Sequence, residues 1–194
     1  MARARLRSRR EVAERCRSLS GLVGSALART AAGDLDPVAV DELWQGEGLG
    51  VLLWACSLAE LPPYDRPFDH AALVRTEPGE VRLRPVDEVA AALETARLWL
   101  WRARTTGLQT GAGVELPPPW ESFDQLVAAT AMRGHERGLL PRPLRGDFPA
   151  FGTIYRSLDE DQKAEAFAIA WERYRGFEWL LGLGRTWDDV PTDA

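Results

Sequence analysis

The sequence predicts an all-α fold, in which one domain over residues 1–194 forms a bundle of several helices around a central apolar helix. Apolar residues recur every three or four positions in several segments, as on one face of a helix, and no segment alternates as a half-buried strand does. No linker rich in proline, glycine or serine divides the chain, so a single core is expected. Irregular loops and at most one minor strand pair complete this prediction.

The first helix is predicted over residues 8–31, behind a basic arm formed by residues 1–7. Ser8 and Glu11 have the spacing of a capping box, in which each side chain binds a backbone N–H group of the first turn. The residues behind the cap place a continuous apolar stripe on one face of this helix: Val12, Cys16, Leu19, Val23 and Leu27.

A second helix begins at Asp36 and Pro37, an N-cap residue followed by a proline in the first turn. Three glycines come after Trp44: Gly46, Gly48 and Gly50. Each glycine costs about 1 kcal/mol relative to alanine inside a helix. Either the helix breaks here, or the bare face of the first and third glycines lets another backbone approach closely. Residues 49–58 are apolar nearly all round, which predicts the central buried helix.

The middle of the chain is predicted to be irregular over residues 62–85. Within it, Asp69 caps a short helical turn over residues 70–74, and residues 81–83 are assigned to a brief strand. A longer helix then follows over residues 86–105, where apolar residues again recur at helical spacing.

Two more helices are predicted in the last third of the chain, one from Phe123 to about residue 137 and one opened by a capping box of Ser157 and Glu160. A surface loop rich in glycine and proline, residues 138–152, separates them. Residues 186–194 form an acidic tail that docks through Trp187. One face of the last helix is expected to enter the core with these residues: Phe167, Trp171, Tyr174, Phe177 and Leu181.

Charge and hydropathy exclude several classes of protein. The formal net charge is −5, and residues 1–17 contain seven arginines and two glutamates, so that segment carries +5 and the remainder −10. An acidic chain is not the composition of a nucleic-acid binder, and contact of the basic arm with RNA or an acidic lipid surface ranks below a solvated arm. The longest apolar run, residues 49–58, is about half of the roughly 20 residues that cross a bilayer. No secretory signal follows the basic start, so we expect a cytoplasmic protein outside the membrane.

Metal, thiol and cofactor chemistry find no support in the sequence. Cys16 and Cys56 each lie in an apolar helical pattern, where a free cysteine behaves as a small buried hydrophobic residue. His70 and His135 are isolated, and with two cysteines they do not form a spaced zinc-ligand set. We therefore predict no metal, no cofactor and no catalytic residue.

A series of short motifs runs along nearly the whole chain. They are Arg7-Ser8 with Glu11-Val12-Ala13 and Arg15, Trp44 with Glu47 before Leu53-Trp54-Ala55, Leu83-Arg84-Pro85 with Glu88, Trp101, Glu172-Arg173, Trp179-Leu180, and Trp187-Asp188-Asp189-Val190-Pro191-Thr192-Asp193. Together they resemble the bacterial domain-of-unknown-function family numbered 4272. The motifs match least between residues 106 and 151, and the closing Trp-Asp-Asp pattern is the most specific of them.

The chain departs from that family at three positions. Gln45 stands where members often carry arginine, Glu178 where they often carry asparagine, and Ala194 where threonine is usual. Because the activity of the family is unknown, the resemblance implies a mostly helical bacterial domain and no chemistry.

One candidate polar cluster and one candidate contact patch emerge. Glu47 lies just before the most apolar stretch, where a carboxylate either raises its pKa or recruits a cation. It is therefore either a base or ligand group, or the acid of an internal ion pair with an arginine such as Arg173 or Arg15. The cluster comprises five residues: Glu47, Arg173, Asp188, Arg15 and Glu88.

The contact patch consists of Trp120, which follows three prolines, and Phe123, because exposed tryptophan is enriched at protein interfaces. The leading functional hypothesis is a protein-interaction or self-associating module without catalysis. The alternative is an enzyme or small-ligand binder that uses glutamate, aspartate and arginine side chains in a pocket between helices.

Overall fold

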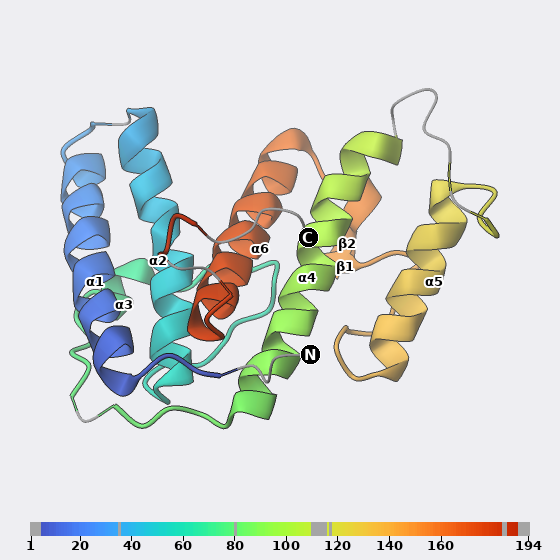
Figure 1. The fold of residues 1–194 in the computed structure, drawn as a ribbon. Helices are drawn as coiled ribbons and strands as arrows, with labels where there is room; N and C mark the ends of the chain where they lie inside the picture. The colour runs from blue at the N-terminus through green and yellow to red at the C-terminus, as the bar shows by residue number, and fades with distance from the viewer. Residues whose placement is uncertain are drawn as a thin grey trace.

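The computed structural model describes residues 5–34, 36–79, 81–109, 116, 118–183 and 186–189. The fold is mostly helical, as predicted, and contains one small two-stranded antiparallel sheet within the described residues. Five long helices lie in the order α1, α2, α6, α4 and α5 across the molecule (Figure 1). The last helix of the chain therefore packs between α2 and α4. None of the described helices combines the length and the apolar character needed to cross a membrane.

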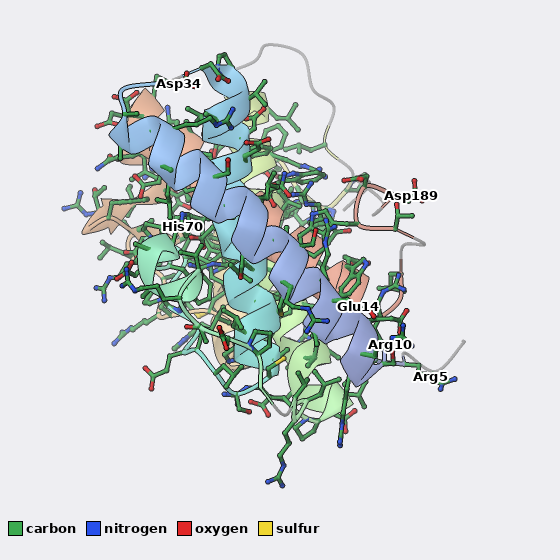
Figure 2. All side chains as sticks on the ribbon, turned by 90° about the vertical axis from the view of Figure 1, so that its left-hand side faces the viewer. Arg5, Arg10, Glu14, Asp34, His70 and Asp189 are labelled. Atoms are coloured by element: carbon green, nitrogen blue, oxygen red, sulfur yellow. The ribbon has the colours of Figure 1, made fainter. Side chains whose placement is uncertain are left out.

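Helix α1 (Arg9–Ala31) begins as the sequence predicted. Ser8 is its N-cap, and Ser8 and Glu11 form the reciprocal hydrogen bonds of a capping box. In Figure 2, α1 lies in front of α2, with Arg10 and Glu14 near its amino-terminal end and Asp34 just beyond its carboxyl-terminal end. Before the helix, the Arg7 backbone N–H donates to the carbonyl of Leu180, so this part of the basic arm is held against the end of α6.

Helix α2 (Pro37–Ala55) runs unbroken through its three glycines. A Cβ on Gly46 would lie 2.5 Å from the His70 ring, and a Cβ on Gly50 would lie 2.4 Å from the Phe68 ring. The bare faces therefore receive two aromatic side chains rather than another backbone, which corrects the expectation for these two positions. The close backbone approach occurs at Gly48 instead, where a Cβ on Gly176 of α6 would lie 3.5 Å from its Cα.

The middle of the chain contains the short helix α3 (His70–Leu73), capped by Asp69 as predicted. Helix α4 (Val86–Gln109) begins at the predicted residue and extends four residues beyond the predicted end. The brief strand predicted over residues 81–83 is wrong, because these residues have no strand partner in the described structure. Their path is fixed differently, by the Arg84 N–H, which donates to the Ala55 carbonyl.

Helix α5 (Phe123–Glu136) leads into the segment that was predicted to be a surface loop, residues 138–152. This segment enters the core with Leu140, Phe148 and Ala150, and it contains one strand of the sheet. Strands β1 (Pro149–Ala150) and β2 (Thr153–Ile154) pair antiparallel, with Pro149 opposite Ile154.

Helix α6 (Glu160–Leu180) does not use the predicted capping box of Ser157 and Glu160. Ser157 belongs to a short 3₁₀ turn, η1 (Tyr155–Ser157), and a second pair two residues further on forms the box instead, namely Asp159 and Gln162. The carboxyl-terminal half of α6 is buried nearly all round, as is that of α2. These two half-helices form the centre of one core to which the other helices contribute.

Candidate functional site

Glu47 of α2 and Arg173 of α6 form an ion pair in the interior, and both side chains are 0% exposed. Arg173 Nε donates to Glu47 Oε2 at 2.8 Å. The other carboxylate oxygen accepts a hydrogen bond from the Phe68 N–H at 2.8 Å and lies 2.9 Å from His70 Nε2. Both oxygens of the acid are thus matched by groups from α6 and from the segment before α3.

Arg173 also holds the irregular segment of residues 62–68 in place. Its Nη1 donates to the carbonyls of Pro62 and Pro63 at 2.7 and 3.1 Å, and its Nη2 donates to the carbonyl of Arg66 at 2.8 Å. The guanidinium carbon lies 4.8 Å from the centre of the Tyr64 ring, close enough for a cation–π contact. One buried arginine therefore supplies the hydrogen bonds that this stretch of backbone does not make as a helix or strand.

A second buried ion pair joins Arg102 of α4 to Asp147. The contact is bidentate, with Nε to Oδ1 at 2.7 Å and Nη2 to Oδ2 at 2.9 Å. Asp147 also accepts hydrogen bonds from the backbone N–H groups of Phe148 and Arg156, at 2.7 and 3.0 Å. This pair was not predicted from the sequence. The available signal was the position of Asp147, which lies between Gly146 and the apolar Phe148.

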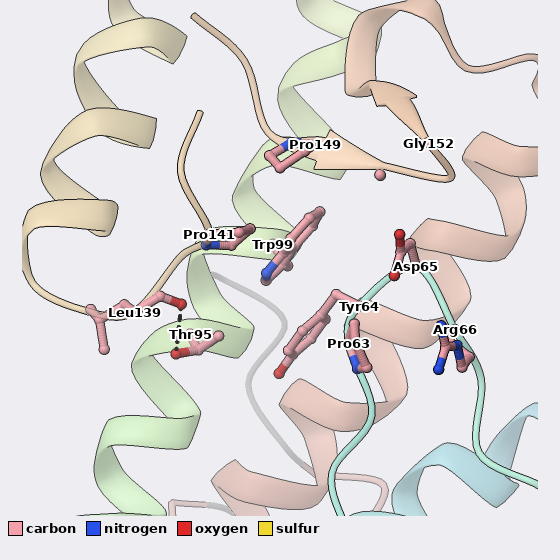
Figure 3. Close-up of a pocket in the computed structure, with 11 residues that line it drawn as sticks. Pro63, Tyr64, Asp65, Arg66, Thr95, Trp99, Leu139, Pro141, Pro149 and Gly152 are labelled. Carbon is pink, nitrogen blue, oxygen red and sulfur yellow. Dashed lines mark hydrogen bonds between the residues drawn. The ribbon is translucent and has the colours of Figure 1, made fainter. Parts of the chain in front are cut away.

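Between these two braced segments lies a cavity of about 550 Å³ (Figure 3), which we call the Tyr64–Trp99 pocket. The rings of Tyr64 and Trp99 stack at an interplanar angle of 3° and a centroid distance of 5.5 Å. Phe148 packs edge-on against Trp99 at 5.3 Å. The lining comes from the 62–68 segment, α4, and residues 139–152: Pro63, Tyr64, Asp65, Arg66, Thr95, Trp99, Leu139, Pro141, Pro149, Ala150 and Gly152.

Two hydrogen bonds join walls of this pocket: Asp65 Oδ2 accepts from the Phe151 N–H at 3.0 Å, and the Thr95 hydroxyl donates to the Leu139 carbonyl at 3.2 Å (Figure 3). Phe151 and Gly152 form the two-residue turn of the hairpin with φ of +49° and +74°. A left-handed conformation is uncommon for phenylalanine and is held only where the surroundings impose it. The hairpin turn is therefore strained at one residue and anchored to the opposite wall at the same residue.

The pocket is mainly apolar and carries no excess of charge. Asp65 and Arg66 contribute one charge of each sign, and three prolines and two aromatic rings form most of the remaining wall. The buried Tyr64 hydroxyl has no hydrogen-bond partner within the described part of the chain. Burial raises the pKa of this hydroxyl, so it is a neutral donor at physiological pH. The arrangement suits an uncharged, largely apolar ligand.

The five residues of the predicted polar cluster do not come together, which corrects that expectation. Glu47 and Arg173 pair in the interior. Glu88 instead pairs on the surface with Arg84, one helical turn away. Arg15 lies over the Trp187 ring at 4.5 Å, and burial lowers its pKa whereas Asp188 nearby raises it. These charges lie at three separate places, with Glu47 and Arg173 in the interior, Glu88 beside Arg84, and Arg15 near Asp188, so the five residues do not form one pocket.

The two residues of the predicted contact patch are partly exposed. Trp120 and Phe123 are both half-buried, and neither lines one of the cavities described here. The described part of the tail docks through Trp187 as predicted. This ring is buried, and its centroid lies 5.8 Å from that of the Trp179 ring. Residues 1–4 of the basic arm and 190–194 of the tail lie outside the described residues.

A second cavity, of about 560 Å³, lies between α2 and α6, and we call it the α2–α6 groove. Its lining is Val40, Asp41, Trp44, Gln45, Phe167, Ala168, Trp171, Glu172 and Arg175. Phe167 is 41% exposed and Trp171 is half-buried, so the amino-terminal part of the predicted core face of α6 points outward. The two rings stack on each other at an interplanar angle of 3°.

Cys16 and Cys56 are buried free thiols, as the sequence predicted. The hydrogen bond between the two thiols, together with burial, raises the pKa of Cys16, which leaves it protonated. Within the described residues, no group of three or more histidine, cysteine, aspartate or glutamate side chains is placed to hold a metal ion.

No protein-family model matches this chain, and the comparisons with curated proteins and with solved structures gave no match either. The resemblance to family 4272 therefore stays a prediction.

Proposed function

We propose that this chain is a binding domain for an uncharged, largely apolar small molecule that occupies the Tyr64–Trp99 pocket. The observation that carries the proposal is that both irregular walls of this pocket are fixed by buried ion pairs, Glu47–Arg173 on one side and Arg102–Asp147 on the other. Removing two charges from water costs several kcal/mol per ion before their attraction offsets it. In this chain the two ion pairs hold segments outside the long helices in one conformation.

A pocket that is fixed before its ligand arrives binds more tightly, because less side-chain and loop entropy is lost on binding. A volume of about 550 Å³ lies in the range of roughly 300–1,000 Å³ that is typical of small-molecule sites. The lining also has the usual composition of such sites, with apolar and aromatic walls and few polar groups.

The experiment uses 1-naphthol as an uncharged bicyclic probe and 1-naphthoate as its charged counterpart. Binding is followed by the NMR chemical shift of the Trp99 indole N–H group. We expect 1-naphthol to bind the wild-type chain and 1-naphthoate to bind at least about tenfold more weakly. Burial removes water from the carboxylate, and the cation of the lining, Arg66, is exposed and lies beside the acid Asp65.

A pocket-filling variant locates the binding site. Thr95→Phe places a ring in the cavity and is expected to abolish binding of 1-naphthol, whereas Thr130→Phe on α5, which is outside the pocket lining, leaves it unchanged. Equal binding by the two variants, or no binding of 1-naphthol by the wild type, would overturn the proposal. Circular dichroism of both variants establishes that each one folds.

The protein-interaction function predicted from the sequence stays a prediction, as do the cytoplasmic location and the bacterial origin. Trp120 and Phe123 line neither the Tyr64–Trp99 pocket nor the α2–α6 groove, so neither of these cavities supports the protein-interaction function at this patch. If the chain binds a partner protein, the structure offers a different surface for it.

A further inference from the structure

We infer that the α2–α6 groove is a docking site for an arginine-bearing segment of a partner protein. The groove is independent of the Tyr64–Trp99 pocket and shares no lining residue with it. Three aromatic rings, two carboxyl groups and two exposed valines in the first turn of α2 carry this inference.

The aromatic rings come from both helices. Phe167 and Trp171 of α6 are one helical turn apart and stack with centroids 6.5 Å apart. Trp44 of α2 lines the same cavity and is held edge-on against His70 at 6.4 Å. The faces of such rings attract guanidinium and ammonium groups, and the attraction grows when the cation loses part of its water. The Arg104 guanidinium already lies 5.6 Å from the centre of the Trp171 ring, so a further cation is expected at Trp44 and Phe167.

The carboxyl groups give the groove a charge that a cation complements. Asp41 is exposed at the rim and has no ion-pair partner within the described part of the chain. Glu172 is nearly buried and accepts a hydrogen bond from Arg175 at 2.5 Å. The Arg175 guanidinium also lies 5.1 Å from the centre of the Trp187 ring, so its position is fixed on both sides. One negative charge in the groove, that of Asp41, is thus left without a counter-charge.

The surface around the groove identifies the occupant as a polypeptide segment. Val40, which lines the cavity, is 36% exposed, and Val38, in the same turn of α2 but on a different side of the helix, is 60% exposed. A segment with an arginine flanked by apolar side chains satisfies both features, since its guanidinium meets the rings and carboxylates while its neighbours cover the valines. Arginine is also a preferred residue at protein interfaces.

The first test uses a capped pentapeptide, acetyl-Gly-Val-Arg-Val-Gly-amide, and the same peptide with citrulline in place of arginine. Citrulline has nearly the same shape but no charge. We expect the arginine peptide to shift the indole N–H signals of Trp44 and Trp171, and to bind at least about tenfold more tightly than the citrulline peptide. Equal affinity of the two peptides, or no binding of either, would overturn the inference.

Substitutions of exposed residues then locate the contact without endangering the fold. Asp41→Asn and Phe167→Ala are expected to weaken the arginine peptide at least about fivefold. Their matched controls, Asp87→Asn on α4 and Met132→Ala on α5, remove an equally exposed acid and an exposed apolar residue outside the groove and should leave binding unchanged. If both members of a matched pair behave alike, the peptide does not occupy the groove.

Size-exclusion chromatography tests the competing occupant, a second copy of this chain. A dimer that dissociates in Phe167→Ala would show that self-association covers the groove and would overturn the inference. If the wild type and Phe167→Ala are both monomers and the wild type binds the arginine peptide, the result supports the inference.

The pH dependence provides a further readout. Burial raises the pKa of Glu172 to about 7, and four charged groups act on this carboxyl: Arg175 and Arg15, which favour its ionised form, and Glu47 and Asp41, which oppose it. An arriving guanidinium favours the ionised form further. Affinity for the arginine peptide should therefore rise several-fold from pH 6 to pH 8. Glu172→Gln should remove this rise, and a pH-independent affinity in the wild type would count against the groove as the site.

Discussion

The Tyr64–Trp99 pocket and the α2–α6 groove have similar volumes, but their walls are held by different forces. The pocket is lined largely by backbone outside the helices, residues 62–68 and 139–152, and a buried ion pair fixes each of these segments. The groove lies between two regular helices whose backbone N–H and C=O groups bond within the helix. The two most deeply buried ion pairs therefore serve segments outside the long helices, because buried N–H and C=O groups outside helices and strands need other partners.

The helical side of the molecule is held by close packing instead. A Cβ on Gly48 would lie 2.6 Å from the Trp187 ring, and a Cβ on Gly176 would lie 3.0 Å from Val51 Cγ1. Small residues at these two positions let α2 and α6 approach each other and let the tail dock on both. Changes to the ion pairs and changes to the glycines should thus affect stability by separate mechanisms, which the following predictions test in order of decreasing effect.

Arg173→Leu should have the largest effect. It leaves the buried Glu47 carboxylate without its cation and removes the donors to the carbonyls of Pro62, Pro63 and Arg66. Removing one partner of a buried ion pair costs about 3–5 kcal/mol. We expect a loss of this size in the free energy of unfolding, measured by urea denaturation, and a loss of 1-naphthol binding in the protein that remains folded.

The double variant Glu47→Leu/Arg173→Leu separates the unpaired charge from the lost backbone hydrogen bonds. It should be more stable than Arg173→Leu alone, because no buried charge remains unpaired. If the double variant is the less stable of the two, the remaining contacts of Glu47, with the Phe68 N–H and with His70, outweigh the cost of its unpaired charge.

The pH dependence of stability should reveal Glu172, the acid on the groove side. Its pKa is raised by burial from 4.5 to about 7 in the folded chain. Because the folded state binds the proton more tightly than the unfolded state, the stabilising contribution is complete below pH 4.5 and is lost as the pH rises to about 7. The shift corresponds to roughly 3 kcal/mol, from 1.36 kcal/mol per unit of pKa.

Glu172→Gln should flatten this part of the stability profile, since an amide does not titrate. Urea denaturation of both proteins at intervals between pH 4.5 and pH 8 measures the difference. Parallel profiles for the wild type and the variant would show that other groups cause the pH dependence.

The helices were predictable where one local signal decided the outcome. Ser8 and Glu11 fixed the start of α1, and the stripe behind them matched its buried face. At α6, two capping boxes lie two residues apart, and local sequence does not choose between them. The choice depends on Tyr155, which packs against Trp99 and places Ser157 in a 3₁₀ turn, a contact between distant parts of the chain.

The candidate site was less predictable for the same reason. Glu47 attracted attention because an acid stood beside an apolar run, and Arg173 was one of two named partners. Arg102 and Asp147 gave no comparable signal, since one lies in an arginine-rich helical pattern and the other in a segment rich in glycine and proline. Periodicity also placed Phe167 in the core, because it does not distinguish the enclosed half of a helix from the half that reaches solvent.

Gly176→Ala tests the packing of the helical side and should have an intermediate effect. Its Cβ would lie 3.0 Å from Val51 Cγ1 and 3.5 Å from the Gly48 Cα, so the two helices must move apart. Overpacking of this kind costs about 1–3 kcal/mol. The control is Gly21→Ala on α1, where nothing lies within 4 Å of the new Cβ and helix propensity favours alanine by about 1 kcal/mol. Opposite signs for the two changes in urea denaturation are expected, and destabilisation by both would contradict the packing argument.

Glu88→Gln should have the smallest effect, although it also removes one acid of an arginine–carboxylate pair. Glu88 and Arg84 are one helical turn apart at the start of α4, and the Glu88 side chain is 43% exposed. Water already solvates both charges, so pairs of this kind contribute at most about 1 kcal/mol and often much less. We expect a change within about 0.5 kcal/mol in urea denaturation and unaltered binding of 1-naphthol. The Glu88–Arg84 and Glu47–Arg173 pairs have the same chemistry. If Glu88→Gln has a small effect on stability and Arg173→Leu a large one, the difference is due to burial and to the backbone carbonyls that Arg173 binds.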